Sequence, residues 1–239
     1  MSKTQSAYRL FHSTETAVTK IYNDMLVAAD GGQMSGLCLL DLTAAFDIVD
    51  HILLLDRLQR QFALRDNVLV RFRSYLSERT FQVVYGGNAW RTVAIFVSSH
   101  KDRCLVRGCL LNFILYTADL PDKIDEHGIN FHAYADDSQL YVLCDCCDTA
   151  PAAPLFEHCI IDVGDWMSAN QLKLNADKTK LLWTGTKHSL SLRDGCGPNL
   201  CLGKDTITPS KHVRVLGVTI SSDLGLDKHV SNVCAAKFF

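Results

Sequence analysis

The stretch Phe131-His-Ala-Tyr-Ala-Asp-Asp-Ser-Gln-Leu-Tyr-Val142 decides the fold of this chain, because it sets two adjacent carboxylates between two runs rich in β-branched and aromatic residues. Such runs around a short polar break are typical of a β-hairpin, so Asp136 and Asp137 are expected at or beside its turn. Adjacent aspartates repel each other and are costly to desolvate. A bound divalent cation would explain them, since Mg²⁺ takes hard oxygen ligands together with substrate phosphates. An exposed acidic turn without a metal is the alternative for this stretch taken alone.

A second acidic position follows a buried run. Gly36-Leu-Cys-Leu-Leu-Asp41 is continuously apolar and ends in an acid, as expected of a central strand that delivers Asp41 at its C-terminal end. Ligands and catalytic groups gather at the carboxyl ends of central strands. Asp41 beside Asp136 and Asp137 would form a three-carboxylate cluster, which is the protein half of a two-metal phosphoryl-transfer site.

Length and composition describe an ordinary globular protein. The 239 residues suffice for a sizeable core in one or two domains, and 48% are hydrophobic and 21% charged. The net charge of −2 argues mildly against strong independent binding of nucleic acid, because free-standing binders are usually basic on at least one face. The ten cysteines lack the paired spacing of a zinc site. Without a signal peptide or long apolar span, reduced thiols in an intracellular protein of the nucleus or cytoplasm, with no membrane partner, are expected.

The order of the expected elements predicts an α+β fold. Capping-type residues from Ser13 begin a helix that Gly31-Gly32 ends, and the strand to Asp41 follows. Residues 189–209 are rich in Gly, Ser and Asp and are expected to form a loop. Further helices are expected at about residues 50–61, 66–76, 105–120 and 151–170, and strands at 81–85, 92–97, 131–142, 180–183 and 213–220.

The motifs resemble those of reverse transcriptases. Asp41-x-x-x-x-Phe46-Asp47 and Tyr134-Ala-Asp-Asp137 look like motifs A and C, and the flanking words narrow the resemblance to non-LTR (LINE-like) retrotransposon polymerases. It extends from Gln5 to about Val230 and implies a polymerase palm, an antiparallel sheet packed on helices, with partial fingers and no complete thumb. Further similar segments, in the family's order, are Gln5–Arg9 with His12–Thr14 (second fingers motif), Phe113–Leu120 (after motif B), Trp166–Asn175 with Lys178–Lys180 (motif D) and Leu216–Val218 (motif E). The implied division is a partial fingers segment at 1–35, the palm with fingers-derived insertions at 36–222 and the start of a truncated thumb connection at 223–239.

The resemblance implies a metal site. By similarity, Asp41 and Asp136 would bridge two Mg²⁺ ions, for which Mn²⁺ is a possible substitute. Asp137 would support the ions from nearby, and the main-chain carbonyl of Leu42 would add a ligand. The implied partners are an RNA template, a DNA primer and deoxynucleoside triphosphates, and the oligomeric state is left open.

The resemblance also implies three substrate contacts. Phe46 stands where the family places a steric gate against the 2′-hydroxyl, and a core aromatic is the alternative. Arg9 would pair with the incoming triphosphate, because Arg suits bidentate phosphate contacts, and a solvated loop Arg is the alternative. Lys178 would protonate the leaving pyrophosphate as the motif D acid, although most such lysines are surface charges.

The chain departs from the family at motif B. The family usually reads Pro-Gln-Gly-Ser-Val-Leu-Gly-Pro there, whereas this chain has His100–Arg107. A set of permitted codons for these residues, read one base earlier from the last base of the Ser99 codon, encodes the complete family motif. We infer that the motif is present in the DNA in a shifted frame that recovers near residues 109–113, with a splicing artefact and true divergence as alternatives. In the chain as it reads, the bulky charges of Lys101, Asp102 and Arg103 would stand in place of the motif's glycines, which allow the backbone to approach template and nucleotide closely.

The sequence therefore favours a reverse transcriptase (RNA-directed DNA polymerase) domain with two-metal nucleotidyl transfer, degenerate through the loss of motif B. The alternative is a catalytically inactive nucleic-acid-binding remnant, and magnesium-dependent primer extension separates the two. A different enzyme on a palm-like scaffold, such as a nucleotide cyclase, is disfavoured by the motif contexts of Phe46 and Lys178.

Overall fold

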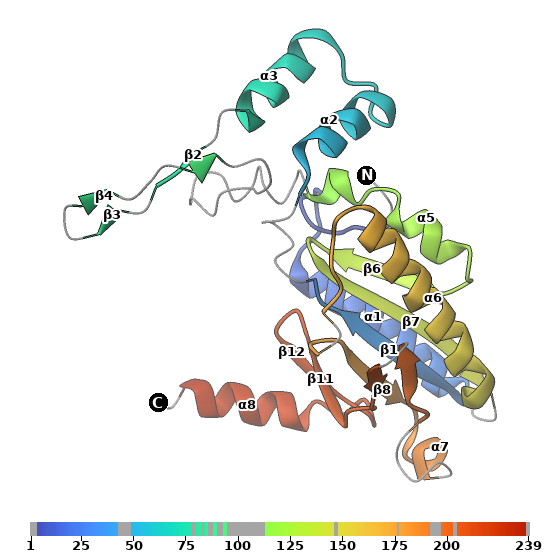
Figure 1. Cartoon of the computed structure of the whole chain (residues 1–239). Helices are drawn as coiled ribbons and strands as arrows, with labels where there is room; N and C mark the ends of the chain where they lie inside the picture. Colours follow the sequence, from blue (N-terminus) through green and yellow to red (C-terminus); the bar gives the residue numbers. More distant parts are fainter. Residues whose placement is uncertain are drawn as a thin grey trace.

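The computed structural model describes most of the chain, with helices on both faces of a central sheet (Figure 1). Phe46 and the segment His100–Arg107 lie outside the described residues. The described ranges are 4–42, 49–77, 80–82, 84–85, 88–89, 93–94, 113–145, 148–175, 177–191, 197–202 and 205–237.

A four-stranded antiparallel sheet in the order β6-β7-β1-β8 forms the centre. β1 is apolar on both faces and lies between β7 and β8, as expected of a buried central run. Gly36 of β1 pairs with Trp183, and a Cβ at position 36 would come within 2.9 Å of the indole ring, so a larger residue there would require the ring to shift. The strands are β1 (Gln33–Leu40), β6 (Asn130–Tyr134), β7 (Asp137–Asp145) and β8 (Lys180–Thr184).

Helix α1 (Thr14–Asp30) covers one face of this sheet (Figure 1). A capping box begins it: the Ser13 side chain accepts from the Thr16 N–H, and the Thr16 side chain accepts from the Ser13 N–H. Its apolar side packs against Leu37 of β1 and Tyr141 of β7 in one hydrophobic cluster. The helix predicted between Ser13 and Gly31 is thus confirmed.

The opposite face is covered by α5 (Leu120–Asp125) and α6 (Thr149–Ala169) (Figure 1). Phe156 of α6 is fully buried in the larger hydrophobic cluster, together with Cys159 and with Cys38 of β1. Burial raises the pKa of the Cys159 thiol to about 12 and raises that of Cys38 as well, so both stay protonated and serve as packing groups. In the part of the chain that the structure describes, no helix has the length and apolar character needed to cross a membrane.

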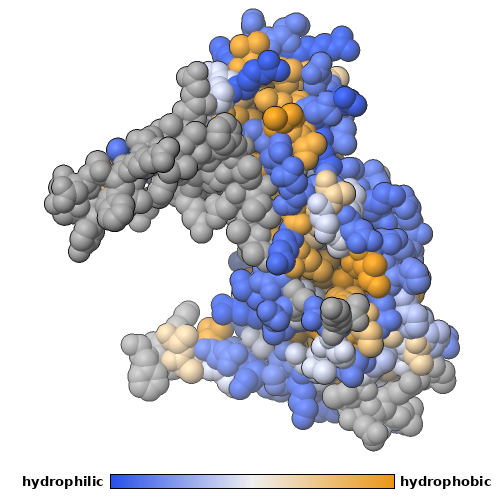
Figure 2. Space-filling model, viewed as in Figure 1, coloured by the Kyte–Doolittle hydropathy of each residue, from blue (hydrophilic) through white to orange (hydrophobic). Residues whose placement is uncertain are grey.

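Helices α2 (His51–Arg60) and α3 (Asp66–Leu76) project beyond the sheet (Figure 1). The Asp50 carboxylate caps α2 by accepting from the N–H groups of its first turn. Hydrophobic residues gather on the surface over these helices (Figure 2). Among the large hydrophobic residues of α2 and α3, Ile52 is 79% exposed and Val70 is 63% exposed. The short strands beyond them are β2 (Thr80–Phe81) with β5 (Val93–Ala94), and β3 (Val84–Tyr85) with β4 (Asn88–Ala89).

Arg57 ties α2 to the segments around α5 and α6. Its guanidinium forms an ion pair with Asp119 at 2.9 Å and donates to the side-chain oxygen of Asn170 at 2.7 Å. It also lies over the rings of Tyr116 and Trp166, at 5.0 and 5.4 Å from their centroids. With 12% of its side chain exposed, Arg57 is the polar centre of this junction.

The C-terminal part corrects two sequence predictions. The strand predicted over residues 213–220 is a hairpin, in which Leu216 and Gly217 both have positive φ, as a type I′ turn requires. The loop predicted over residues 189–209 contains the end of a short helix and a second hairpin. The elements are α7 (Lys187–Ser191), β9 (Leu200–Leu202), β10 (Asp205–Ile207), β11 (His212–Val215), β12 (Val218–Ser221) and α8 (Asp227–Lys237).

The helix predicted over residues 105–120 is also corrected at its end. Residues 113–116 are helical, but the chain then turns, and α5 begins separately at Leu120. The Leu120 N–H donates to the Thr117 carbonyl, which closes the turn. Pro121 suits the first turn of the new helix, where its missing N–H has no intrahelical partner to lose. The remaining part of the predicted helix, up to residue 112, lies outside the described residues.

Candidate active site

The two-residue loop Ala135–Asp136 joins β6 to β7. Tyr134 and Asp137 form the last pair of the ladder on either side of it. Ala135 has a φ of 59°, the left-handed value that tight hairpin turns need at their first loop position. The prediction that Asp136 and Asp137 lie at a hairpin turn is confirmed.

Asp41 reaches the same end of the sheet from β1. Leu40 pairs with Ser138 at the last position of the β1–β7 ladder, so Asp41 directly follows one member of this pair and Asp137 directly precedes the other. The structure therefore brings Asp41 together with Asp136 and Asp137, although they are far apart in the sequence.

At this end of the sheet, the negative charges of Asp41, Asp136 and Asp137 repel one another when no cation is bound. Partial desolvation raises the pKa of both Asp136, which is half-buried, and Asp137, which is itself exposed to solvent. The charge of Asp41 raises the pKa of both groups further, and that of Asp136 also acts on Asp137. A cation held between them would compensate this repulsion.

The chemistry of the donors fits Mg²⁺ or Mn²⁺, since all are hard carboxylate oxygens. Within the described residues, no three His, Cys, Asp or Glu side chains are grouped closely enough to hold an ion as they stand. Binding an ion here would therefore draw the carboxylates closer together than they lie in this structure.

The segment after α6 crosses the end of β1. Leu42 forms an isolated antiparallel bridge with Leu174, and the Asn175 N–H donates to the Asp41 carbonyl at 2.8 Å. This crossing places the Lys178 Nζ 3.8 Å from an Asp41 carboxylate oxygen, with 65% of the Lys178 side chain exposed. The Lys178 ammonium group thus lies beside the Asp41 carboxylate and is exposed to solvent.

The other expected site residues are less informative. Leu42 is 9% exposed and directly follows Asp41. Arg9 is partly exposed on the N-terminal segment, and its guanidinium donates to the Gln5 carbonyl at 3.4 Å. The predicted gate, Phe46, lies outside the described residues.

Two residues of the site were missed in sequence reasoning. Asn175 supports the Asp41 backbone, and Gln5 contacts the acidic turn through its side-chain amide. Both belong to segments with a family resemblance, but neither has a local pattern that predicts its contact.

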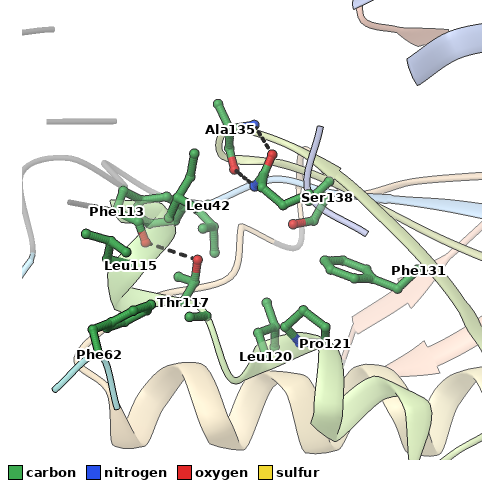
Figure 3. A pocket seen from close by; sticks show the side chains of 14 residues that line it. Leu42, Phe62, Phe113, Leu115, Thr117, Leu120, Pro121, Phe131, Ala135 and Ser138 are labelled. Carbon is green, nitrogen blue, oxygen red and sulfur yellow. Dashed lines mark hydrogen bonds between the residues drawn. The ribbon is translucent and has the colours of Figure 1, made fainter. Parts of the chain in front are cut away.

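A narrow pocket lies against the back of the acidic turn (Figure 3). Its lining includes Leu42, Phe113, Phe131, Ala135 and Ser138, and is mostly apolar. Its enclosed space of about 30 Å³ suits one or two water molecules and is too small for a nucleotide.

Comparison with protein families gives a match over most of the chain. The model described as reverse transcriptase (RNA-dependent DNA polymerase) matches residues 1–220. The RNA-directed DNA polymerases from mobile element jockey of Drosophila melanogaster and Drosophila funebris are 25% and 24% identical over 236 residues, which is 97% of this chain. A probable RNA-directed DNA polymerase from transposon BS of Drosophila melanogaster is 29% identical over 181 residues, or 73% of the chain. The chain spans only 24%, 24% and 19% of the length of these relatives.

Solved structures of telomerase share the fold. Apo telomerase from Candida tropicalis, truncated from its C-terminal domain, superposes with a TM-score of 0.60 at 11% identity, covering 94% of this chain and 40% of that one. Telomerase from Candida albicans, in complex with a fragment of telomeric RNA, gives 0.56 at 14% identity, covering 92% and 34%. Such low identities bear on the fold alone, and they confirm the predicted palm-like α+β architecture.

Proposed function

The chain belongs to the reverse transcriptase (RNA-dependent DNA polymerase) family, and from this premise we propose that Asp41, Asp136 and Asp137 are the carboxylates of its nucleotidyl-transfer site. The predicted non-LTR reverse transcriptase domain is confirmed. The observation that carries the proposal is the approach of Asp41 to the Asp136–Asp137 turn at one end of the central sheet. The raised pKa values of that turn support it, because strongly perturbed carboxylates gather at functional sites.

Two Mg²⁺ ions, or Mn²⁺ in their place, would be held by Asp41, Asp136, Asp137 and the Leu42 carbonyl. When bound, they would supply activation of the primer 3′-hydroxyl and charge stabilisation of the leaving pyrophosphate. The substrates would be an RNA template, a DNA primer and deoxynucleoside triphosphates, as the relatives' name of RNA-directed DNA polymerase suggests.

The neighbouring side chains would handle the triphosphate. Lys178 is close enough to Asp41 to deliver a proton from its Nζ to the leaving pyrophosphate, and its exposure leaves it free to move. Arg9 would pair with the triphosphate, and Phe46 would exclude a 2′-hydroxyl. In the same proposal, residues 1–35 form a partial fingers segment, residues 36–222 form the palm, and residues 223–239 begin the connection to a thumb.

We further propose that this chain is impaired. His100–Arg107 replaces the glycine-containing motif B, and the added charges would obstruct template and nucleotide. A remnant that binds nucleic acid without catalysis is the second candidate, and the altered motif B is the observation that favours it.

Primer extension on a primed RNA template with Mg²⁺ tests the proposal. The chain should show little or no incorporation. A version with motif B restored, fused to a thumb from a related element, should incorporate deoxynucleotides. Asp136→Asn should abolish that incorporation, whereas Asp145→Asn, at the far end of the same strand β7, should not. Incorporation that survives Asp136→Asn would refute the assignment of the carboxylates.

A further inference from the structure

Gln5 has no part in the chemistry proposed above, yet its side chain binds the turn that carries the acids. We propose that Gln5 is a positioning residue, whose amide clamps Ala135 and thereby holds Asp136 and Asp137 in place for ion binding. This inference rests on the proposed function of those carboxylates. It adds to the site a residue from a segment that is 130 positions away in the chain.

The clamp is a reciprocal pair of hydrogen bonds. The Gln5 Oε1 accepts from the Ala135 N–H at 3.0 Å, and the Gln5 Nε2 donates to the Ala135 carbonyl at 3.1 Å; Figure 3 draws both bonds at Ala135. Both backbone groups of this loop residue are thus satisfied by one side chain. Gln5 is 6% exposed, so water competes little for these bonds.

Only a side chain with one donor and one acceptor in the same plane can bind both the N–H and the carbonyl of Ala135. Rotating the amide by half a turn would set its NH₂ against the Ala135 N–H. The Ala7 N–H, which also donates to Gln5 Oε1 at 2.9 Å, holds the amide in the required orientation. A carboxylate or an apolar side chain of similar length could not make both bonds.

The turn needs such support because of its backbone. Ala135 has a left-handed φ of 59°, which costs a residue with a Cβ on the order of 1 kcal/mol relative to glycine. Such conformations persist where neighbouring groups hold the backbone in place, and here the Gln5 amide holds Ala135 through its two hydrogen bonds. The repulsion between Asp136 and its acidic neighbours adds a second force that would displace the turn.

The clamp itself is anchored to the sheet. Gln5 forms a parallel bridge with Ala133 of β6, next to the turn. The Ser6 N–H donates to the Ala133 carbonyl, and the Ala133 N–H donates to the Thr4 carbonyl, both at 2.9 Å. These bonds use main-chain atoms only. The segment carrying Gln5 is therefore attached along the β6 edge of the sheet, directly beside the turn.

The test uses the whole chain and two variants, Gln5→Met and Gln5→Asn. The first keeps the length of the side chain without its polar atoms, and the second keeps the amide but is too short to reach. Ser6→Ala is the matched control, since it removes a bond of the same segment to β6 and leaves the Gln5 amide intact. Amide hydrogen exchange by NMR is measured without metal, and Mn²⁺ affinity is measured by electron paramagnetic resonance. The exchange rate of the Leu37 amide, in the middle of β1, reports whether the sheet stays folded.

We expect exchange of the Ala135 amide to accelerate about tenfold in both Gln5 variants, as for the loss of one net hydrogen bond. The Mn²⁺ dissociation constant should rise on the order of tenfold, which is typical when residues that orient metal ligands are lost. Leu37 exchange should not change in either variant, and Ser6→Ala should leave both Ala135 exchange and Mn²⁺ affinity at their original values.

Unchanged Ala135 exchange in folded Gln5 variants would overturn the clamp. Accelerated exchange with unchanged Mn²⁺ affinity would overturn the positioning role and leave a structural bond only. A separate result tests the proposed function. If the unmodified chain binds no Mn²⁺, or if Asp136→Asn leaves its Mn²⁺ binding unchanged, the proposed metal site is refuted. The clamp is then judged on Ala135 exchange alone.

Discussion

Replacing Arg57 with alanine should destabilise the chain by about 3 kcal/mol. The change removes the ion pair to Asp119, the bond to Asn170 and the cation–π contacts with Tyr116 and Trp166. Removing one partner of a buried ion pair costs about 3–5 kcal/mol, and each cation–π contact is worth about 0.5–1 kcal/mol or more when desolvated. These terms are not additive. Because 34% of the Asp119 side chain is exposed and water will take over part of its solvation, the lower end of the range applies.

The same helix offers a matched control. Arg60 forms an ion pair with Asp56 at 2.7 Å, but 78% of the Arg60 side chain is exposed. Such helical surface pairs contribute about 0.3–0.5 kcal/mol, so Arg60→Ala should have little effect. Arg57→Lys should fall between the two, since lysine keeps the charge and loses the planar fork that reaches Asp119 and Asn170 together.

Urea unfolding followed by circular dichroism measures these differences through the midpoint and slope of the transition. In a thermal scan, a chain of this size should lose about 2–4 °C for each kcal/mol, or about 6–12 °C for Arg57→Ala. If Arg57→Ala destabilised the chain no more than Arg60→Ala, the junction between α2 and the α5–α6 side would not depend on this arginine, and the reasoning would be refuted.

Three further predictions concern the sheet and the site. Without metal at neutral pH, Asp136→Asn should raise the free energy of unfolding, because the raised pKa of Asp136 means that its charge destabilises the fold above that pKa. This gain in stability should vanish on acidification, as Asp136 of the original chain takes up its proton. Mg²⁺ should stabilise only the original chain. A urea titration at several pH values, with and without Mg²⁺, checks this, and a gain that persists at acid pH would contradict it. Gly36→Ala should cost about 1–3 kcal/mol in urea unfolding, because its Cβ would meet the Trp183 ring at 2.9 Å; an unchanged midpoint would show that the ring moves aside freely. Replacing His100–Arg107 with Pro-Gln-Gly-Ser-Val-Leu-Gly-Pro in a chain supplied with a thumb should increase incorporation on the order of a hundredfold, since misplacement by about 1 Å can cost that much. Equal activity of the repaired and unrepaired fusions would show that the segment is tolerated.

Local patterns in the sequence determined much of this protein. The β-branched and aromatic runs around Asp136 predict the hairpin, the apolar run before Asp41 predicts the central strand, and the capping residues at Ser13 predict the start of α1; the structure has all three. These features follow from the sequence because periodicity, capping and turn chemistry act within a few residues of the chain. The expectation that the acids meet came from placing Asp41 at a strand end and Asp136 and Asp137 at a hairpin turn, and the family resemblance supported it.

The tertiary structure alone decided which distant groups touch. It sets the register that brings the end of β1, next to Asp41, to the start of β7, and it brings the Gln5 amide onto Ala135. It also gathers the partners of Arg57 from two segments, residues 116–119 and 166–170. It also showed that residues 213–220 form a hairpin. The sequence did not predict this turn, because the dipeptide Leu216-Gly217 alone does not indicate two positive φ angles. A pattern of residue types specifies conformation and burial nearby, whereas a contact across the fold depends on packing and register summed over the whole chain, and a one-residue slip of a strand would exchange all its partners.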